Sequence, residues 1–278
     1  MSVLLFTLIV WLGAMLAGFL GALTGLGGGV VIVPMLVLVF GVDLRYAIGA
    51  SLVSVIATSS GAASAYVREG YSNIRIGMFL EIATTVGALA GAVLASKVPG
   101  GAIAVVFGVV LLFSAYLSSR PQPDETAADT PDRLATRLKL DGSYPTAEGQ
   151  KSYHVHRVPL GFALMFVAGI LSGLLGIGSG AFKVLAMDQA MRIPFKVATT
   201  TSNFMIGVTA AASAGVYLSR GYVDPSLSMP ITLGVLLGSF LGTRVLVVAQ
   251  PRKLRIVFAV VILALAVEMI YKGLTGGL

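Results

Sequence analysis

Two glycine-rich stretches interrupt apolar sequence at matching places and could together form an anion site. The first, residues 21–34, reads GALTGLGGGVVIVP, and the second, residues 172–185, reads SGLLGIGSGAFKVL. Clustered glycines let the chain turn sharply, and a helix that restarts after such a turn begins with free N–H groups and the positive end of its dipole. A helix start of this kind binds anions without a basic side chain. The residues expected to line the site are Gly25, Gly27, Gly28, Gly29, Gly176, Gly178, Ser179 and Gly180.

Close helix packing through small residues is the alternative explanation for clustered glycines. We assign that role to the glycines with GxxxG spacing in residues 87–95 and 234–242. The glycines of residues 25–29 and 176–180 are denser than packing requires, so they favour a break that lines a substrate site.

Charged residues within apolar stretches form the second set of candidates, because they are costly in a membrane and usually functional. Lys183 follows the second glycine cluster, where the first half of the chain has Ile32. An ammonium near a helix start opposes the dipole, so it predicts a negative partner, either a bound anion or Asp188. Glu81 is a candidate for proton coupling or for pairing with Lys183. A snorkelling lysine and a solvent-facing glutamate are the alternatives.

Hydroxyl and amide side chains form the third set, because they can donate to anionic oxygens. Residues 198–204 read ATTTSNF, and several serines and threonines occur at helical spacing in residues 51–60. Back-bonding of these hydroxyls to carbonyls of their own helix is the alternative role. The candidates for substrate binding are Ser51, Ser54, Thr200, Thr201 and Asn203.

The elements that must position these residues are membrane helices. The chain has 278 residues, of which 56% are hydrophobic and 11% charged, and its mean hydropathy is +0.93. Residues 2–23, 46–67, 100–119 and 197–219 carry no charge, and each is long enough to cross a bilayer core of about 30 Å. The composition therefore predicts an all-α polytopic membrane protein. The net charge of +7 reports orientation in the membrane and is no sign of nucleic-acid binding.

An internal repeat divides the chain into two halves. Residues 17–29 align with 168–180 at an offset of 151, and residues 87–95 match 234–242. We expect a first transmembrane repeat in 1–119, a polar linker in 120–157 and a second transmembrane repeat in 158–278. Each repeat is a helical hairpin broken at its glycines plus three transmembrane helices, which makes eight to ten membrane segments. A long repeat of this kind is typical of transporters with a pseudo-two-fold axis.

The distribution of basic residues favours inverted halves. With the linker in the cytoplasm and both termini outside, 14 Lys and Arg residues lie inside and four outside, whereas parallel halves give eight and ten. Within the linker we expect a flexible stretch over residues 120–133 and a more ordered one over 139–156, with a hairpin-type turn at Asp141-Gly142. His154 and His156 lack further ligands at suitable spacing, so we expect no metal and no cofactor.

These motifs together resemble the TauE/SafE sulfite exporter family. The likeness rests on the GLGGG…VP and GIGSGAFKV stretches, the PFKVATTTSNFMIGVTA helix and the DGSY…EG linker, and it covers nearly the whole chain. It implies a multi-pass carrier in the bacterial inner membrane that exports sulfite, sulfoacetate or related organosulfonates, with Lys183 among the matched positions. Two departures are Ser179, where a third glycine is expected, and Leu185, where a proline usually stands.

Other function classes remain as alternatives. An anion channel would use the same helix starts, and a membrane scaffold or assembly protein needs no transport site. An enzyme is disfavoured, because both histidines lie in the linker and Ser179 has no base near it in a span. The expected partners are a small anion and the lipid bilayer, without nucleic acid, and a homodimer is left open.

Overall fold

The structure is a computed structural model that describes residues 3–24, 28–68, 71–119, 132–146, 149–248 and 251–276. The first half of the chain forms α1 (Val3–Thr24), α2 (Gly29–Leu38), α3 (Leu44–Arg68), α4 (Ile74–Leu94) and α5 (Gly100–Ser119). The linker forms α6 (Arg133–Arg137), β1 (Gly142–Thr146) and β2 (Gly149–Tyr153). The second half forms α7 (Val158–Leu175), α8 (Gly180–Leu185), the π-helical turn η1 (Ala186–Ala190), α9 (Phe195–Ser219), α10 (Pro225–Val248) and α11 (Pro251–Thr275).

The outer surface of the helices is apolar. Large hydrophobic side chains are more than half exposed on different helices, among them Leu16 on α1, Ile82 on α4 and Leu233 on α10. An apolar surface of this extent is unfavourable in water and fits the hydrocarbon of a bilayer. Within the described residues, α4, α7 and the first 18 residues of α10 are long and apolar enough to cross a membrane. The prediction of an all-α membrane protein is confirmed.

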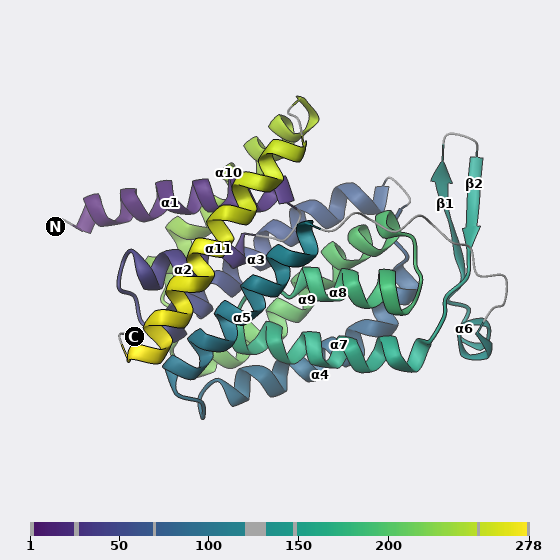
Figure 1. Ribbon diagram of the computed structural model, residues 1–278, viewed down its shortest axis with the longest axis horizontal. Coiled ribbons are helices and arrows are strands. Elements are labelled where there is room, and N and C mark those ends of the chain that lie inside the picture. Colours follow the sequence, from purple (N-terminus) through teal and green to yellow (C-terminus); the bar gives the residue numbers. More distant parts are fainter. Residues whose placement is uncertain are drawn as a thin grey trace.

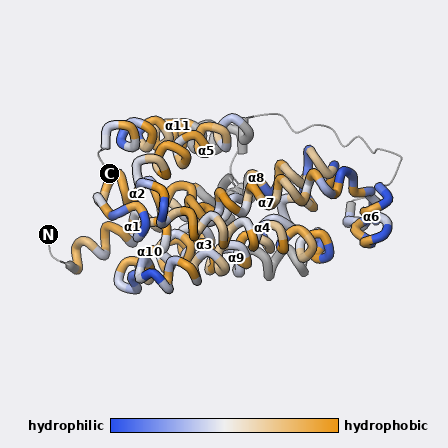
Figure 2. The backbone as a smooth tube through the Cα atoms, turned by 90° about the horizontal axis from the view of Figure 1, so that it is seen from below, coloured by the Kyte–Doolittle hydropathy of each residue, from blue (hydrophilic) through white to orange (hydrophobic). Residues whose placement is uncertain are grey.

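The two ends of the helix bundle carry different loops. Figure 1 shows the N- and C-termini at one end and the linker strands with α6 at the other. At the terminal end, the Lys272 ammonium donates to the carbonyl of Leu38 over 3.5 Å, so the end of α11 meets the end of α2. At the linker end, Asn73 Nδ2 donates to the carbonyl of Leu140 over 3.2 Å. Figure 2 shows hydrophilic segments near both ends and hydrophobic chain between them.

Each half begins with a hairpin, and the two hairpins start from opposite ends. α1 begins at the terminal end, and α2 returns there (Figure 1). α7 begins beside the linker, and η1 returns to it, because the N–H of His156 donates to the carbonyl of Met191 over 3.0 Å. α2 has 10 residues, and α8 with η1 has 11, about half the length that a membrane-spanning helix needs.

Helices of the first half pack on helices of the second half, and equivalent contacts are separated by the same number of residues. α1 packs on α10 and α4 packs on α7. A Cβ on Gly87 would collide with the carbonyl of Phe166, and a Cβ on Gly238 would collide with that of Met15. The first pair and the second differ by 151 residues, the offset of the glycine clusters. The match of residues 87–95 with 234–242 is therefore wrong by one helical turn, because the packing makes Gly87 equivalent to Gly238.

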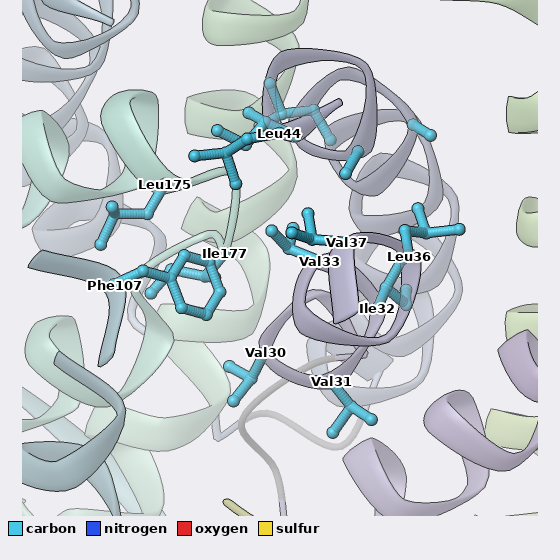
Figure 3. Packing of buried hydrophobic residues seen from close by; sticks show 14 of the residues in the cluster. Val30, Val31, Ile32, Val33, Leu36, Val37, Leu44, Phe107, Leu175 and Ile177 are labelled. Atoms are coloured by element: carbon cyan, nitrogen blue, oxygen red, sulfur yellow. The ribbon is translucent and has the colours of Figure 1, made fainter. Parts of the chain in front are cut away.

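The half-length helix α2 is surrounded by the rest of the core. Val30, Ile32, Val33 and Leu36 are all buried, and Figure 3 shows α2 side chains grouped near Ile177, which belongs to the second glycine turn. α5 and α11 pack together and form a layer along one side of the bundle (Figure 2). Because protein surrounds α2, its backbone does not face lipid. An irregular start of this helix therefore exposes no unpaired backbone polar group to hydrocarbon.

The linker contains a small antiparallel sheet, in which Gly142 pairs with Tyr153. The predicted turn at Asp141-Gly142 is wrong, because Gly142 already lies in β1 and the connection falls at residues 147–148, outside the described residues. Asp141 instead accepts a hydrogen bond from the N–H of Val155 over 2.8 Å. A Cβ on Gly142 would lie 2.9 Å from the Tyr153 hydroxyl, so glycine serves close packing there.

Candidate functional site

The two glycine breaks meet inside the molecule. The Ser51 hydroxyl on α3 donates to the carbonyl of Gly176 over 2.8 Å, and a Cβ on Gly29 would lie 3.1 Å from the same carbonyl oxygen. The start of α2 and the turn before α8 are therefore neighbours, although they are about half the chain apart. Gly28 and Gly29 are buried at this junction, whereas Gly25 and Gly27 lie outside the described residues.

The second break is built from left-handed backbone. Gly176 and Gly178 have φ of +70°, and Ser179 has φ of +46°. Glycine adopts this conformation readily, but for a serine it costs about 1 kcal/mol or more. The Ser179 hydroxyl is also buried without a hydrogen-bond partner, and its side chain is 2% exposed. A strained residue with an unsatisfied buried hydroxyl is typical of a site that receives a ligand.

α8 restarts directly after this strained turn. The N–H of Lys183 donates to the carbonyl of Ser179 over 3.1 Å, which closes the first turn of the helix. The N–H groups of the residues before Lys183 have no carbonyl within the helix to bond to, because they belong to its first turn. The Ser202 hydroxyl on α9 approaches Gly180 and donates to its carbonyl over 3.3 Å.

Lys183 is fully buried and belongs to a chain of polar contacts between α8, α9 and α4. Its ammonium donates to the Thr209 hydroxyl over 2.5 Å, and this hydroxyl donates to Glu81 Oε1 over 2.6 Å. The ammonium lies 3.9 Å from Glu81 Oε2. Thr85 also donates to Oε1, over 3.1 Å, whereas Oε2 is buried without a hydrogen-bond partner. The negative partner predicted for Lys183 is therefore Glu81 and not Asp188.

The remaining candidates divide between the junction and other places. Ser54 and Thr200 bond to carbonyls of their own helices, as the back-bonding alternative expects. Thr201 accepts a hydrogen bond from the N–H of Asn73 over 3.0 Å, so it joins α9 to the loop before α4. Asn203 is partly exposed on α9 and has no side-chain hydrogen bond to the described residues. Of the hydroxyls predicted to bind substrate, Ser51 and Ser179 lie at the glycine junction.

Thr209 is the polar residue that the sequence analysis missed. It is fully buried and joins Lys183 to Glu81. The repeat offers a signal for it, because Thr209 lies 151 residues after Thr58, a hydroxyl already noted within residues 51–60. Within the described residues, no group of three or more His, Asp and Glu side chains is arranged to hold a metal ion.

Comparison with known proteins supports a role in transport. Residues 10–269 match the family described as Sulfite exporter TauE/SafE. The probable membrane transporter protein YunE of Bacillus subtilis is 27% identical over 97% of this chain and 98% of its own length. The probable membrane transporter protein YdhB of the same organism is 26% identical over 87% and 89%.

An archaeal relative shows the same extent of similarity. A probable membrane transporter protein of Methanocaldococcus jannaschii is 24% identical over 88% of each chain. No solved structure matches the sequence at a significant level. Since the family match covers nearly the whole chain, and the fold is a helical bundle with an apolar surface, the protein is a membrane transporter that belongs to the sulfite exporter TauE/SafE family.

Proposed function

We propose that the protein is a secondary transporter of small sulfur-containing anions, such as sulfite, sulfoacetate or related organosulfonates, and that it exports them across the bacterial inner membrane. The observation that carries this proposal is the meeting, inside the bundle, of the start of the half-length helix α2 at Gly29 with the glycine turn before α8 at Gly176. Discontinuous helices at equivalent positions of two repeats are the usual site of substrate binding in such transporters.

The binding site is the junction of the two glycine turns. Backbone N–H groups at the helix starts, the Ser179 hydroxyl and the Lys183 ammonium supply neutral donors and one positive charge, while Ser51 lines the junction and holds the Gly176 carbonyl. A sulfonate is a weak base, so several donors around one cation suit it better than a proton-transfer partner. Gly25, Gly27, Thr200, Thr201 and Asn203 remain candidates from the sequence, and Ser54 faces its own helix carbonyl.

The halves are inverted repeats, with residues 1–119 and 158–278 on either side of the linker. Three observations support this: the hairpins start from opposite ends, α1 pairs with α10 as α4 pairs with α7, and the glycine contacts repeat at an offset of 151. The linker end, which holds Arg75 and Lys196, is the cytoplasmic end by the positive-inside rule, and both termini lie outside. Rocking of one half against the other would open the junction to each side in turn.

Transport can be tested in proteoliposomes with radiolabelled sulfite. We expect saturable uptake that is accelerated by unlabelled sulfite inside the vesicles, and competition by sulfoacetate or taurine ranks the substrates. Gly178→Leu should abolish this uptake, because φ of +70° and an Ile206 methyl 2.8 Å from the added Cβ both oppose a side chain. Gly215→Ala, at an open position of α9, is the matched control. Unitary currents would favour a channel, and absence of flux for every anion would contradict the proposal.

A further inference from the structure

We infer that substrate and Glu81 compete for the Lys183 ammonium, so that each anion binds together with a proton taken up by Glu81. This inference rests on the proposed function and names the coupling ion of the same site. The carrier would then run in either direction, as set by the combined gradients of the anion and of protons.

The argument starts from charge balance at a buried position. Lys183 is fully buried and Glu81 is 6% exposed, and they lie 3.9 Å apart. Together they carry no net charge, which is the arrangement that makes burial of two ions tolerable. An anion added beside Lys183 leaves one negative charge without compensation, and this is costly away from water. A proton on Glu81 removes the excess charge.

The structure contains the atom to receive that proton. Thr85 and Thr209 both donate to Oε1 of Glu81, whereas Oε2 is buried without a hydrogen-bond partner among the residues that the structure describes. Protonation at Oε2 therefore breaks no existing hydrogen bond. The proton comes from the aqueous phase with the anion and is released again when the anion leaves.

The ammonium can serve the anion as well as the carboxylate. An ammonium has three N–H donors, and among the described residues Lys183 gives one of them, to Thr209. Lys183 also lies on the first turn of α8, and its backbone is bonded to Ser179, the strained residue with the unpartnered hydroxyl. Helical side chains lean toward the helix start, so an anion at the α8 start lies within reach of this ammonium.

Thr209 is the positioning residue of this exchange. Its hydroxyl accepts from Lys183 and donates to Glu81, so it links the two charges in one hydrogen-bonded chain. When Glu81 is protonated, its attraction for Lys183 falls, and the ammonium is free to bind the anion while Thr209 keeps its place on α9.

Few other titratable groups face this pair. α7, which packs against α4, has no titratable side chain between Val158 and Leu175. On α9, Lys196 lies over the Tyr71 ring and Tyr217 donates to the carbonyl of Gly173. The other titratable or charged groups of the elements around the pair are Arg75 on α4, Asp188 on η1, Tyr116 on α5, Arg220 after α9, and Arg45, Tyr46, Tyr66 and Arg68 on α3, which packs on α9. Lys183 and Glu81 are therefore the buried pair whose charge balance an anion would change.

The test is binding of methanesulfonate, a singly charged probe, by the purified protein as a function of pH. The charge of this anion is constant between about pH 5.5 and about pH 8.5, unlike that of sulfite. We expect wild-type affinity to fall about tenfold per pH unit on the alkaline side, and calorimetry in buffers of different ionisation enthalpy to show uptake of about one proton per anion. A variant with His154→Gln and His156→Gln controls for the linker histidines.

Glu81→Gln mimics the protonated carboxyl and gives the decisive comparison. Its affinity should become independent of pH and exceed that of the wild type by at least about tenfold at about pH 8.5. Thr209→Val should shift the midpoint of the wild-type pH profile, and Thr209→Ser should restore it. Thr232→Val, at the position of the other half that corresponds to Glu81, should leave the profile unchanged.

The outcomes separate the two proposals. Anion binding by the wild type without pH dependence, or without proton uptake, overturns the coupling and leaves the transporter in place. A pH profile of Glu81→Gln equal to that of the wild type also overturns it, as does loss of binding by this variant at every pH. If the wild type binds none of the sulfur anions at any pH, the proposed function fails, and the coupling fails with it.

Discussion

The two halves each place a short helix at the junction but different side chains behind it. In the second half, Lys183, Thr209 and Glu81 form a buried polar chain. At an offset of 151, the corresponding residues are Ile32, Thr58 and Thr232. Thr58 bonds to carbonyls of its own helix, and the Thr232 hydroxyl is buried without a partner. The duplicated fold thus supplies two helix starts but, within the described part of the chain, one buried cation, which makes the site asymmetric.

The largest difference between the halves should appear when the cation is removed. Lys183→Met keeps the length of the side chain and removes its charge, and we expect transport to fall on the order of 100-fold, because a charged hydrogen bond contributes about 1.5–3 kcal/mol. Ile32→Met conserves volume in the other half and should change transport by less than about twofold. Uptake per incorporated protein measures both variants. Transport by Lys183→Met at half the wild-type rate would contradict a role for this charge.

Gly29 should tolerate a methyl group less well than Gly180, its counterpart 151 residues later. A Cβ on Gly29 would lie 2.9 Å from the Ser51 hydroxyl and 3.1 Å from the carbonyl of Gly176, whereas the nearest atom to a Cβ on Gly180 is the terminal methyl of Ile206. We expect Gly29→Ala to cost about 1–3 kcal/mol, as overpacking does, and Gly180→Ala to cost less. Thermal unfolding in detergent compares them. Equal losses would show that the junction is looser than the contacts indicate.

The hydroxyls of Thr209 and Thr232 should differ in their contribution to stability. Thr209→Val leaves a lysine donor without its partner and removes one of the two hydroxyls that donate to Glu81 Oε1, which should lower the free energy of unfolding by about 1–3 kcal/mol. Thr232→Val removes a hydroxyl that has no partner and should be neutral or slightly stabilising. Denaturation of the two variants under identical conditions gives the comparison, and a greater loss in Thr232→Val would reverse it.

The residues that precede α4 and α10 should give the smallest difference in stability between the two halves. Asn73 caps α4 through the N–H of Ile76, and Asp224, 151 residues later, precedes α10 and accepts from the N–H and hydroxyl of Ser226. The hydrogen bond from the Ser226 side chain, followed by that from its backbone, lowers the pKa of Asp224. The carboxylate therefore stabilises the fold at neutral pH, and this contribution is lost as the pH falls through the lowered pKa.

Asp224→Asn makes the second cap resemble the first. We expect the variant to lose part of the acid sensitivity of unfolding while its stability at neutral pH changes little, because Asn also caps helices well and the site is exposed. Unfolding temperature measured across the acidic range shows this. An unchanged acid profile would mean that other carboxylates dominate.

Much of the architecture could be predicted from the sequence, because glycine clusters and uncharged stretches are local signals. α2 begins at the first glycine cluster and α8, continued by η1, begins at the second, where the sequence predicts that a helix restarts. The register of α4 against α7 could not be predicted, because several small residues with GxxxG spacing allow two alignments that differ by one turn. Packing of Gly87 on Phe166 and of Gly238 on Met15 selects one of them.

The site was predictable in its parts but not in its contacts. Lys183 and Glu81 were candidates because intramembrane charges are rare, yet their pairing through Thr209 depends on how α4 crosses α9. Ser54 and Thr200 share the residue type of Ser51 and have a different role, because a helix carbonyl of their own satisfies them. Hydroxyl-rich sequence alone cannot tell these roles apart.

The packing of first-half helices on second-half helices has a consequence for biosynthesis. α1 is made first, but the helix that packs on Gly18, α10, emerges from the ribosome about two hundred residues later. Until then α1 enters the membrane without its partner, and α4 waits in the same way for α7. Lipid and insertion factors must shield their glycine faces in the interval. Assembly is therefore completed late, when the helices of the second half have been inserted and pack on those of the first half.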